Sequence, residues 1–360
     1  MTEAKHPGLG LFRLISERGD RNFDKVRKAL RGMTLKRRNM ALTWVREPNK
    51  NSNKCTSLIH VAAENDAVEI FRLLVEEYGA NVNFAAKDGR TPLHFAAFNN
   101  SVKVASYLMG VRDPVVFVTH KDKDGRTPLH SAVKNGSTGV MEVILSNVPG
   151  IINMHDRFNS PPLYLAIYLK KKEAFDLLLA RSELDLPPET LIYAIKHDPS
   201  GEFVRRLINR GASATFAREI DGMTPLHRAA NKFNLEATRM LLRLPDVSVN
   251  VRDRNNETPL HFAVKDMDDE HKRKVALLLI DHGADLKAVN NDGKSPLDLV
   301  SDEGHRELLS KWFPLRGLRL LTNALRISSD PRYLIQRKVL ELKDLRLYIE
   351  SFIHSSSAQV

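Results

Sequence analysis

Histidine is the residue of this 360-residue chain best suited to acid–base or metal chemistry, and it occurs 13 times. Five histidines share one place in a recurring phrase: His60, His94, His130, His227 and His261. Other copies of the phrase hold Tyr164, Ile192 and Asp298 at that place. Isoleucine can neither transfer a proton nor bind a metal, so the slot predicts structural histidines that hydrogen-bond between neighbouring copies. We therefore expect no enzyme, no cofactor and no metal site.

Other motifs that would indicate an enzyme are missing from the sequence. There is no nucleotide-binding loop, no His-Glu-x-x-His pair and no nucleophile elbow, and Gly8-Leu9-Gly10 is too short to count. The single cysteine, Cys55, excludes an internal disulfide and a zinc site built on paired cysteines. We interpret Cys55 as an ordinary residue at the entrance of a repeat rather than as a reactive thiol.

Hydropathy and the opening residues predict a chain of the cell interior. No apolar run approaches the roughly 18 residues that a membrane-spanning helix requires. The first residues, MTEAKHPGLGLFRLI, lack the basic start, apolar middle and cleavage site of a secretory signal. We expect a cytoplasmic protein, with the nucleus as an alternative, and no insertion into a membrane.

The net charge of +11 lies at the two ends of the chain. Residues 1–54 hold 14 Lys and Arg against 5 Asp and Glu, and residues 311–360 hold 9 against 4. The densest cluster, residues 25–38, has seven basic side chains and no acidic one. Its simplest interpretation is the solvated face of a terminal helix; an import signal or a patch for an acidic partner is the alternative. Because the excess avoids the middle of the chain, we expect only weak nucleic-acid binding.

One phrase recurs along the middle of the chain. Its copies are TSLIHVAA (56–63), TPLHFAA (91–97), TPLHSAV (127–133), PPLYLAI (161–167), ETLIYAI (189–195), TPLHRAA (224–230), TPLHFAV (258–264) and SPLDLV (295–300). Successive copies begin 35, 36, 34, 28, 35, 34 and 37 residues apart. Self-similarity at such a period indicates an array in which each unit buries its apolar face against the next.

The chemistry of the phrase predicts the start of a helix. Thr91 can accept a backbone N–H as the N-cap, and Pro92 suits the first helical position, where a missing N–H costs nothing. Leu93, Ala96 and Ala97 then line one face. We assign the structural role in the repeat to Thr91, His94, Thr127, His130, Thr224, His227, Thr258 and His261.

The phrase and its spacing resemble the ankyrin repeat, and the resemblance covers about four fifths of the chain. It implies an all-α solenoid of helix–turn–helix repeats with β-hairpin fingers and a concave protein-binding surface. We expect three regions: a basic helical cap or degenerate repeat at 1–54, an array of about eight repeats at 55–311, and a short helical module at 312–360. We expect the chain to be monomeric on its own.

The fifth copy departs from the others. Only 28 residues separate it from the fourth, and SELDLPPE (182–189) stands where a glycine turn and a finger are expected. We predict that the repeat near 189–211 keeps its helices and lacks its finger. Neutral drift is one explanation. The other is an interruption of the binding surface that leaves a notch for a partner between Phe158 and Met223.

Repeat geometry, as the resemblance implies it, points to the residues that face a partner. They lie just before the threonine of the phrase and just after its alanines. The predicted contact residues are Arg90, Phe98, Arg126, Lys134, Phe158, Tyr168, Met223 and Lys232. Aromatic and arginine side chains on a polar surface are typical of interaction hot spots.

The last residues are similar to a suppressor-of-cytokine-signalling box, a helical module that recruits elongins and a cullin. PLRGLRLLTNALR (314–326) is similar to its first helix and LRLYI (345–349) to its closing motif. The resemblance implies elongin B/C and a cullin as partners through 314–352, with Leu318, Leu321, Leu325, Leu345 and Tyr348 at the ligase core. Leu321 replaces the usual cysteine, Gly317 a leucine, and VLEL (339–342) lacks the usual prolines.

Three functional classes follow from these patterns. The first is a substrate-recognition subunit of a cullin-type ubiquitin ligase, in which the repeats bind the target. The second is an ankyrin scaffold or inhibitor whose tail is only a cap, with the cytosolic ankyrin part of a channel-like protein as a variant. The third is a nucleic-acid-associated protein that works through residues 25–38. All three contain the repeats, so the ends of the chain must distinguish them.

Overall fold

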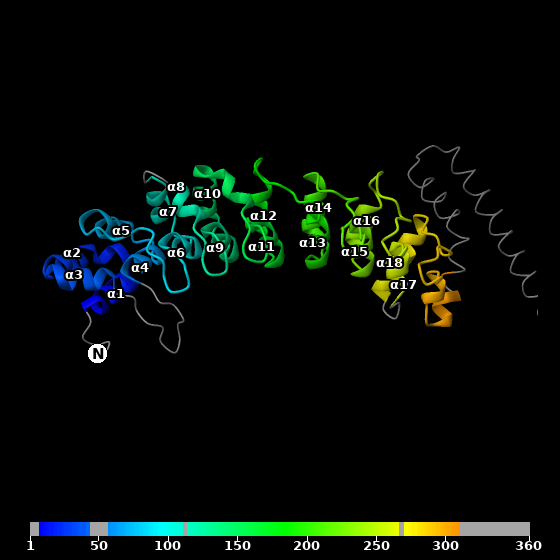
Figure 1. Cartoon of the computed structure of the whole chain (residues 1–360), viewed down its shortest axis with the longest axis horizontal. Helices are drawn as coiled ribbons and strands as arrows, with labels where there is room; N and C mark the ends of the chain where they lie inside the picture. The colour runs from blue at the N-terminus through cyan, green and yellow to red at the C-terminus, as the bar shows by residue number, and fades with distance from the viewer. Residues whose placement is uncertain (1–6, 44–56, 111–113, 266–269, 308, 310–360) are drawn as a thin grey trace, which may run out of the picture. The chain divides into compact units, whose positions relative to one another are not determined.

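The structure is a computed structural model that describes residues 7–43, 57–110, 114–265, 270–307 and 309. These residues form helices joined by turns, and no strand occurs among them. The chain divides into two compact units between Leu186 and Pro187. The predicted all-α class is confirmed for the described residues (Figure 1).

Unit 1 begins with helices that precede the first copy of the phrase. They are α1 (Pro7–Arg18), the 3-10 turn η2 (Gly19–Asn22), α2 (Phe23–Arg31) and α3 (Leu35–Thr43). Four helix pairs follow: α4 (Leu58–Glu64) with α5 (Val68–Arg72) and the π-helical turn η3 (Leu73–Glu77); α6 (Pro92–Asn99) with α7 (Val102–Met109); α9 (Pro128–Asn135) with α10 (Thr138–Asn147); and α11 (Pro162–Tyr168) with α12 (Lys172–Leu179). Helix α8 (Pro114–Thr119) precedes the third pair, and η4 (Pro149–Asn153) follows it.

Unit 2 continues the same plan with three further helix pairs. They are α13 (Thr190–His197) with α14 (Glu202–Asn209), α15 (Pro225–Asn231) with α16 (Leu235–Leu241), and α17 (Pro259–Val264) with α18 (Glu270–Asp281). The last copy of the phrase forms only the short turn η5 (Leu297–Leu299). The fifth copy thus has its helix pair, and no turn of the finger type described below occurs in its described lead-in, residues 182–189.

The four copies that read Thr-Pro-Leu-His fold as their residues predict. Thr91 is the extended N-cap of α6, Pro92 occupies the first turn, and Leu93, Ala96 and Ala97 are buried. The small alanines let neighbouring first helices approach, and α6 contacts both α4 and α9. In the first copy, Ser57 rather than Thr56 is the N-cap, so the phrase there starts one residue later than its spelling indicates.

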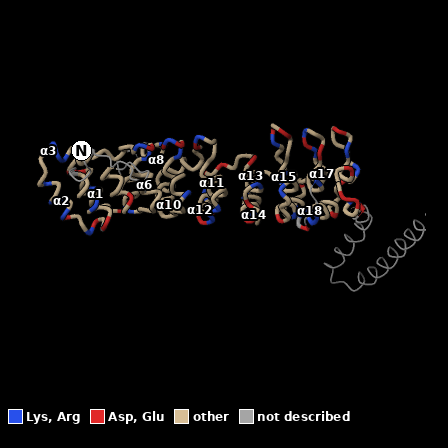
Figure 2. Tube along the Cα trace, turned by 90° about the horizontal axis from the view of Figure 1, so that it is seen from below, with Lys and Arg blue, Asp and Glu red and all other residues tan. Residues whose placement is uncertain are grey.

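The fingers that precede the helices are five-residue turns. In the turn 122–126, the Asp122 N–H donates to the Arg126 carbonyl at 2.9 Å. The Asp122 carboxylate then accepts the N–H groups of Asp124 and Arg126 at 2.8 and 2.9 Å. The same pattern starts at Asp156, Asp253 and Asn290. Figure 2 shows basic and acidic residues together in these turns.

Neighbouring fingers are joined by single backbone hydrogen bonds, which we call rungs. In unit 1, Lys123 N–H donates to the Asp88 carbonyl at 3.0 Å, and Arg157 N–H donates to the Asp124 carbonyl at 3.1 Å. Gly125 makes the close approach: a Cβ there would lie 2.6 Å from the Arg157 nitrogen. Glycine is required at this point for space as well as for its φ of +72°.

Candidate functional site

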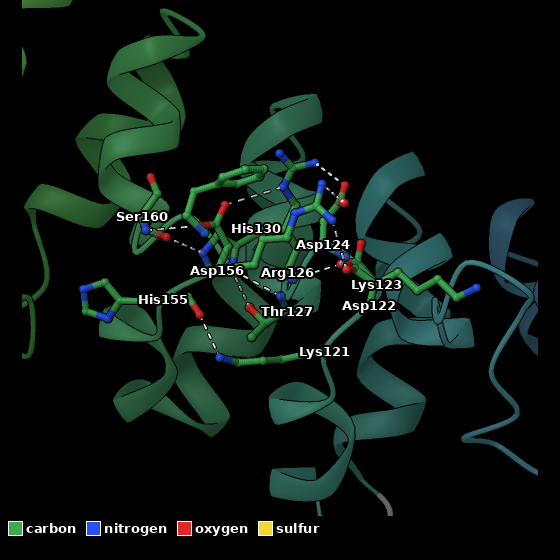
Figure 3. Close-up of polar contacts among 12 residues, drawn as sticks. Lys121, Asp122, Lys123, Asp124, Arg126, Thr127, His130, His155, Asp156 and Ser160 are labelled. Atoms are coloured by element: carbon green, nitrogen blue, oxygen red, sulfur yellow. Dashed lines mark hydrogen bonds and ion pairs between the residues drawn. The ribbon is translucent and has the colours of Figure 1, made fainter.

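The shared histidine position is a buried bridge between repeats. His130 is fully buried, with Nδ1 2.9 Å from the Thr127 hydroxyl and 3.2 Å from the Thr127 backbone nitrogen (Figure 3). Its Nε2 lies 3.1 Å from the Ser160 carbonyl in the next repeat. Because a carbonyl can only accept, Nε2 carries the proton and Nδ1 accepts. Both ring nitrogens are therefore engaged by the chain itself.

The other four histidines repeat this geometry. Each Nδ1 accepts at its own N-cap, and each Nε2 donates to the carbonyl that ends the next finger: Arg90 for His60, Arg126 for His94, Glu257 for His227 and Lys294 for His261. These hydrogen bonds join each of the four repeats to the finger that follows it. Burial lowers the pKa of His60, His94 and His130 to about 4, and it also lowers the pKa of His227 and His261.

The predicted arginines are held within their own fingers. Arg126 Nη1 lies 3.2 Å from the Asp124 carboxylate, which also pairs with Arg157 at 2.9 Å, and Arg126 Nε is 3.8 Å from Asp156 (Figure 3). Arg90 binds Asp88 at 2.6 Å and stacks on Phe95. Although burial opposes it, the hydrogen bond from Arg90 lowers the pKa of Asp88. Both arginines therefore stiffen the fingers.

The other predicted contact residues differ in exposure. Phe158 and Tyr168 are large apolar side chains that are 62% and 58% exposed. Lys134 and Lys232 are exposed, and Phe98 is half-buried. Met223 is only 7% exposed, so the structure gives it a packing position and not an accessible one.

The structure brings three of the predicted residues into one row. Phe98, Lys134 and Tyr168 occupy equivalent positions at the ends of α6, α9 and α11, and these helices contact one another in sequence. Phe158 lies in the finger before α11, where the Arg157 guanidinium stacks at 4.7 Å from its ring centre. Lys232 and Met223 belong to unit 2.

The sequence reasoning missed five exposed large apolar residues, Leu35, Met40, Val115, Ile220 and Val289, of which two are the most exposed. Ile220, in the turn that leads to α15, is 78% exposed, and Leu35, at the start of α3, is 69% exposed. The prediction used only the positions next to the threonine and after the alanines. A search of the finger tips for apolar residues would have found Ile220, whereas nothing in the spacing of the repeats points to Leu35.

The turn between the two helices of a repeat holds another missed position, which we call the corner residue. It has positive φ in Asp66, Asn100, Gly136, Lys170 and Phe233. The Asp66 and Asn100 side chains accept N–H groups of the next repeat, from Val104 at 3.0 Å and from Val140 at 3.2 Å. The residue types at this position could have revealed it in the sequence, because Asn, Asp and Gly adopt positive φ most readily.

Several expectations fall outside the described residues. These are Cys55 and the five predicted ligase-core residues, Leu318, Leu321, Leu325, Leu345 and Tyr348. In the part of the chain that is described, no cluster of three or more His, Cys, Asp or Glu could hold a metal ion. Nor does any described helix combine the length and the apolar character needed to span a bilayer.

Comparison with known proteins supports the repeat assignment. NF-kappa-B inhibitor zeta of Bos taurus is 29% identical over 143 residues, 39% of this chain and 20% of its own length. Inversin of Mus musculus is 28% identical over 164 residues, 44% of this chain and 15% of its own. Human protein phosphatase 1 regulatory subunit 27 is 30% identical over 132 residues, 37% of this chain and 82% of its own. The chain thus spans a small part of the first two relatives.

The family comparison covers most of the chain. A model described as ankyrin repeats (3 copies) matches residues 33–117, 113–188 and 191–290. Apart from Thr190, these ranges contain the helix pairs from α4 to α18 and the bridges of His60, His94, His130 and His227. Ankyrin repeats are protein–protein interaction modules, and the chain belongs to the ankyrin-repeat family.

Proposed function

We propose that this protein is a non-enzymatic binding module that holds a protein target on unit 1. The observation that carries the proposal is the exposure of Phe158 and Tyr168 within a single repeat. Two large aromatic side chains in water on a scaffold of this kind are typical of an interaction hot spot.

The rigidity of the surroundings supports the same function. Asp122 and Asp156 fix their fingers through paired bonds to backbone N–H groups, and the rungs at Lys123 and Arg157 tie each finger to its neighbour. A surface that is ordered before binding loses little conformational entropy when the partner arrives. The residues around Phe158 and Tyr168 are therefore suited to selective binding.

The names of two relatives suggest how such a module acts. One is called an inhibitor and the other a regulatory subunit. We propose by analogy that this chain acts on its target by occupying it or by bringing it to another protein, and that it does so in the cytoplasm.

Paired aromatic variants test the target-binding proposal. Phe158→Ala with Tyr168→Ala should remove most captured proteins from a quantitative affinity purification, because hot-spot truncations each cost about 2 kcal/mol. Ile220→Ala in unit 2 is the matched control, since it also removes one exposed apolar side chain. A protein that binds the unmodified chain and the double variant equally would contradict a target site on unit 1.

The adaptor function is a second candidate, and the sequence of the tail favours it. Residues 314–326 and 345–349 resemble the two ends of the elongin-binding box, which makes residues 312–360 a candidate module for joining a bound target to a cullin ligase. A helix of such a module would insert apolar side chains into a groove of its partner.

Changing Leu318 and Leu321 to aspartate tests this second candidate. The double variant should lose co-purification with elongins while it keeps the target captured through Phe158 and Tyr168. Leu35→Asp on α3 is the control for adding charge at a leucine. If the unmodified chain brings down no elongin or cullin, the adaptor candidate is wrong and the scaffold or inhibitor remains.

A further inference from the structure

We propose that the ends of α9 and α11 form a site for an acidic, apolar-containing segment of the protein target. We call this site the basic corner and define it as Lys134, Tyr168, Lys170 and Lys171. The inference rests on the proposed function and adds the chemical class of the partner. Three observations carry it: a lysine in a left-handed conformation, a charge cluster without an acid, and an aromatic residue beside the cluster.

Lys170 breaks the rule that its neighbours follow. The preceding corner residues in unit 1 are Asp66, Asn100 and Gly136, and the first two cap a helix of the next repeat. Lys170 has φ of +55° and a side chain that cannot accept a backbone N–H. A lysine in this conformation costs about 1 kcal/mol relative to glycine. A local cost without a local gain is typical of a functional position.

Lys171 replaces a second structural residue. In the two preceding repeats this position holds Ser101 and Ser137, whose hydroxyls donate to carbonyls of the repeat before, at 3.3 and 3.4 Å. The Lys171 ammonium instead lies beside the preceding corner, 3.9 Å from where a Cβ of Gly136 would be. Lys171 therefore reaches back to the end of α9.

No ion pair among the described residues involves Lys134, Lys170 or Lys171, and the nearest acids in sequence are Glu142 and Glu173. Lys134 lies in the last turn of α9 and is exposed, as is Lys170. No aspartate or glutamate occurs in residues 127–141 or 161–172, which include both first helices and their turns. Lys171 lies beside Gly136 at the end of α9, the helix that carries Lys134, and cations gathered at one corner lower the free energy of a bound carboxylate cluster. The basic fingers differ, because Arg126 and Arg157 both pair with Asp124.

The aromatic residue sets the second requirement on the ligand. Tyr168 is 58% exposed and stands in the row that runs from Phe98 through Lys134. An apolar side chain of the ligand that packs on the Tyr168 ring would bury its exposed apolar surface, which carboxylates alone would leave in contact with water. The corner therefore fits acidic residues interspersed with apolar ones. Nucleic acid fits less well, because strong phosphate binding near physiological salt takes roughly 6–10 cationic contacts.

Binding of a fluorescein-labelled peptide of glutamates with interspersed leucines, measured by anisotropy on the full chain, tests the proposal. Lys170→Gln with Lys171→Gln should weaken binding about tenfold, and Tyr168→Ala should do the same. The matched control is Lys36→Gln with Arg37→Gln on α3, which removes the same charge from another exposed basic cluster. The control should leave the affinity within about twofold. A glutamine-for-glutamate version of the peptide should not bind.

Other outcomes distinguish an error in the basic-corner proposal from an error in the proposed target binding. The proposal is overturned if the α3 variant weakens binding as much as the corner variant, or if a labelled single-stranded oligonucleotide binds more tightly than the peptide through the same lysines. It is also overturned if the peptide shows no affinity at all. If the aromatic double variant still loses the captured target in that case, the proposed target binding stands and only the acidic class of partner is wrong.

Discussion

Two neighbouring repeats of unit 1 differ at four equivalent positions that join one repeat to the next. In the repeat at 127–147, Thr127 and His130 form the buried bridge, Gly136 turns the corner and Ser137 bonds the preceding repeat. In the repeat at 161–179, proline, tyrosine, lysine and lysine occupy these four positions. The second repeat also carries Tyr168, and the finger that leads into it carries Phe158.

Under the proposed function, stability and recognition are placed in different repeats. A nearest-neighbour array tolerates a weak member that packs on a stronger neighbour, and α11 packs on α9. The repeat at 127–147 uses its polar residues to bond its neighbours. The repeat at 161–179 keeps only the apolar core of the phrase and presents aromatic and basic side chains to solvent. Four predictions test this division, beginning with the largest expected effect.

Acid should destabilise the chain through the histidine bridges. The folded pKa of His60, His94 and His130 is about 4, below the usual 6.5, so the unfolded chain binds more protons between these values. The contribution is complete above pH 6.5 and is lost as the pH falls towards 4, by up to about 3 kcal/mol for each histidine. Thermal unfolding across this range should show the loss. His130→Phe should make the decline shallower, and an unchanged slope would contradict the bridge.

Removing one bridge should have the next largest effect. His130→Ala leaves a cavity, strands the Thr127 hydroxyl and removes one of the two donors to the Ser160 carbonyl, so the free energy of unfolding should fall by about 3 kcal/mol. Lys134→Ala in the same helix should change it by less than about 0.5 kcal/mol, because its side chain is exposed. Urea denaturation measures both. Equal effects at the two positions would mean that the bridge does not support the repeat.

The left-handed position of the finger should respond differently to substitution in the two repeats. Gly125→Ala places a Cβ 2.6 Å from the Arg157 nitrogen at a φ of +72°, so we expect a loss of about 2 to 3 kcal/mol. The equivalent finger position before α11 is Asn159, which already adopts φ of +55° with a side chain. Asn159→Gly should change stability by less than about 1 kcal/mol. If Gly125→Ala leaves the free energy of unfolding unchanged, the rungs are not formed in solution.

The smallest effect should be a gain in stability. Lys170→Asn gives the corner the residue found at Asn100, which adopts the left-handed conformation more readily than lysine. We expect the free energy of unfolding to rise by about 1 kcal/mol while the affinity for the acidic peptide falls. Denaturation and anisotropy on the same preparation measure both. A loss of stability would mean that Lys170 has a structural role that the contacts do not show.

Much of the fold could be predicted from the sequence, because the same helix-starting residues recur in successive copies of the phrase. Thr91, Pro92 and Leu93 specify a helix start by local chemistry, and the exchange of His130 for Tyr164 or Ile192 indicated a structural slot. The histidine bonds followed from the same comparison of copies. Ser57 shows the limit: the first copy is shifted by one residue because either hydroxyl residue, Thr56 or Ser57, can serve as a cap.

The surface could be predicted less well, since exposure depends on contacts between fingers. Arg126 was expected to face a partner, yet Asp124 and Asp156 hold it in place. Met223 stood at the same position of the phrase and is buried. Spacing gives a residue its place in the repeat, whereas its charge partners and its burial come from neighbouring repeats about 34 residues away in sequence. That information is not in any single copy.

The rungs between fingers have a consequence for how such a protein changes its target over evolution. Each rung uses only main-chain atoms, such as the Arg157 N–H and the Asp124 carbonyl, so it places no demand on the side chain of either residue. Lys123 and Arg157, whose N–H groups form the rungs, are also exposed to solvent. Substitutions at these two residues can change the binding surface while the rungs, which need only the main chain, keep the fingers in register.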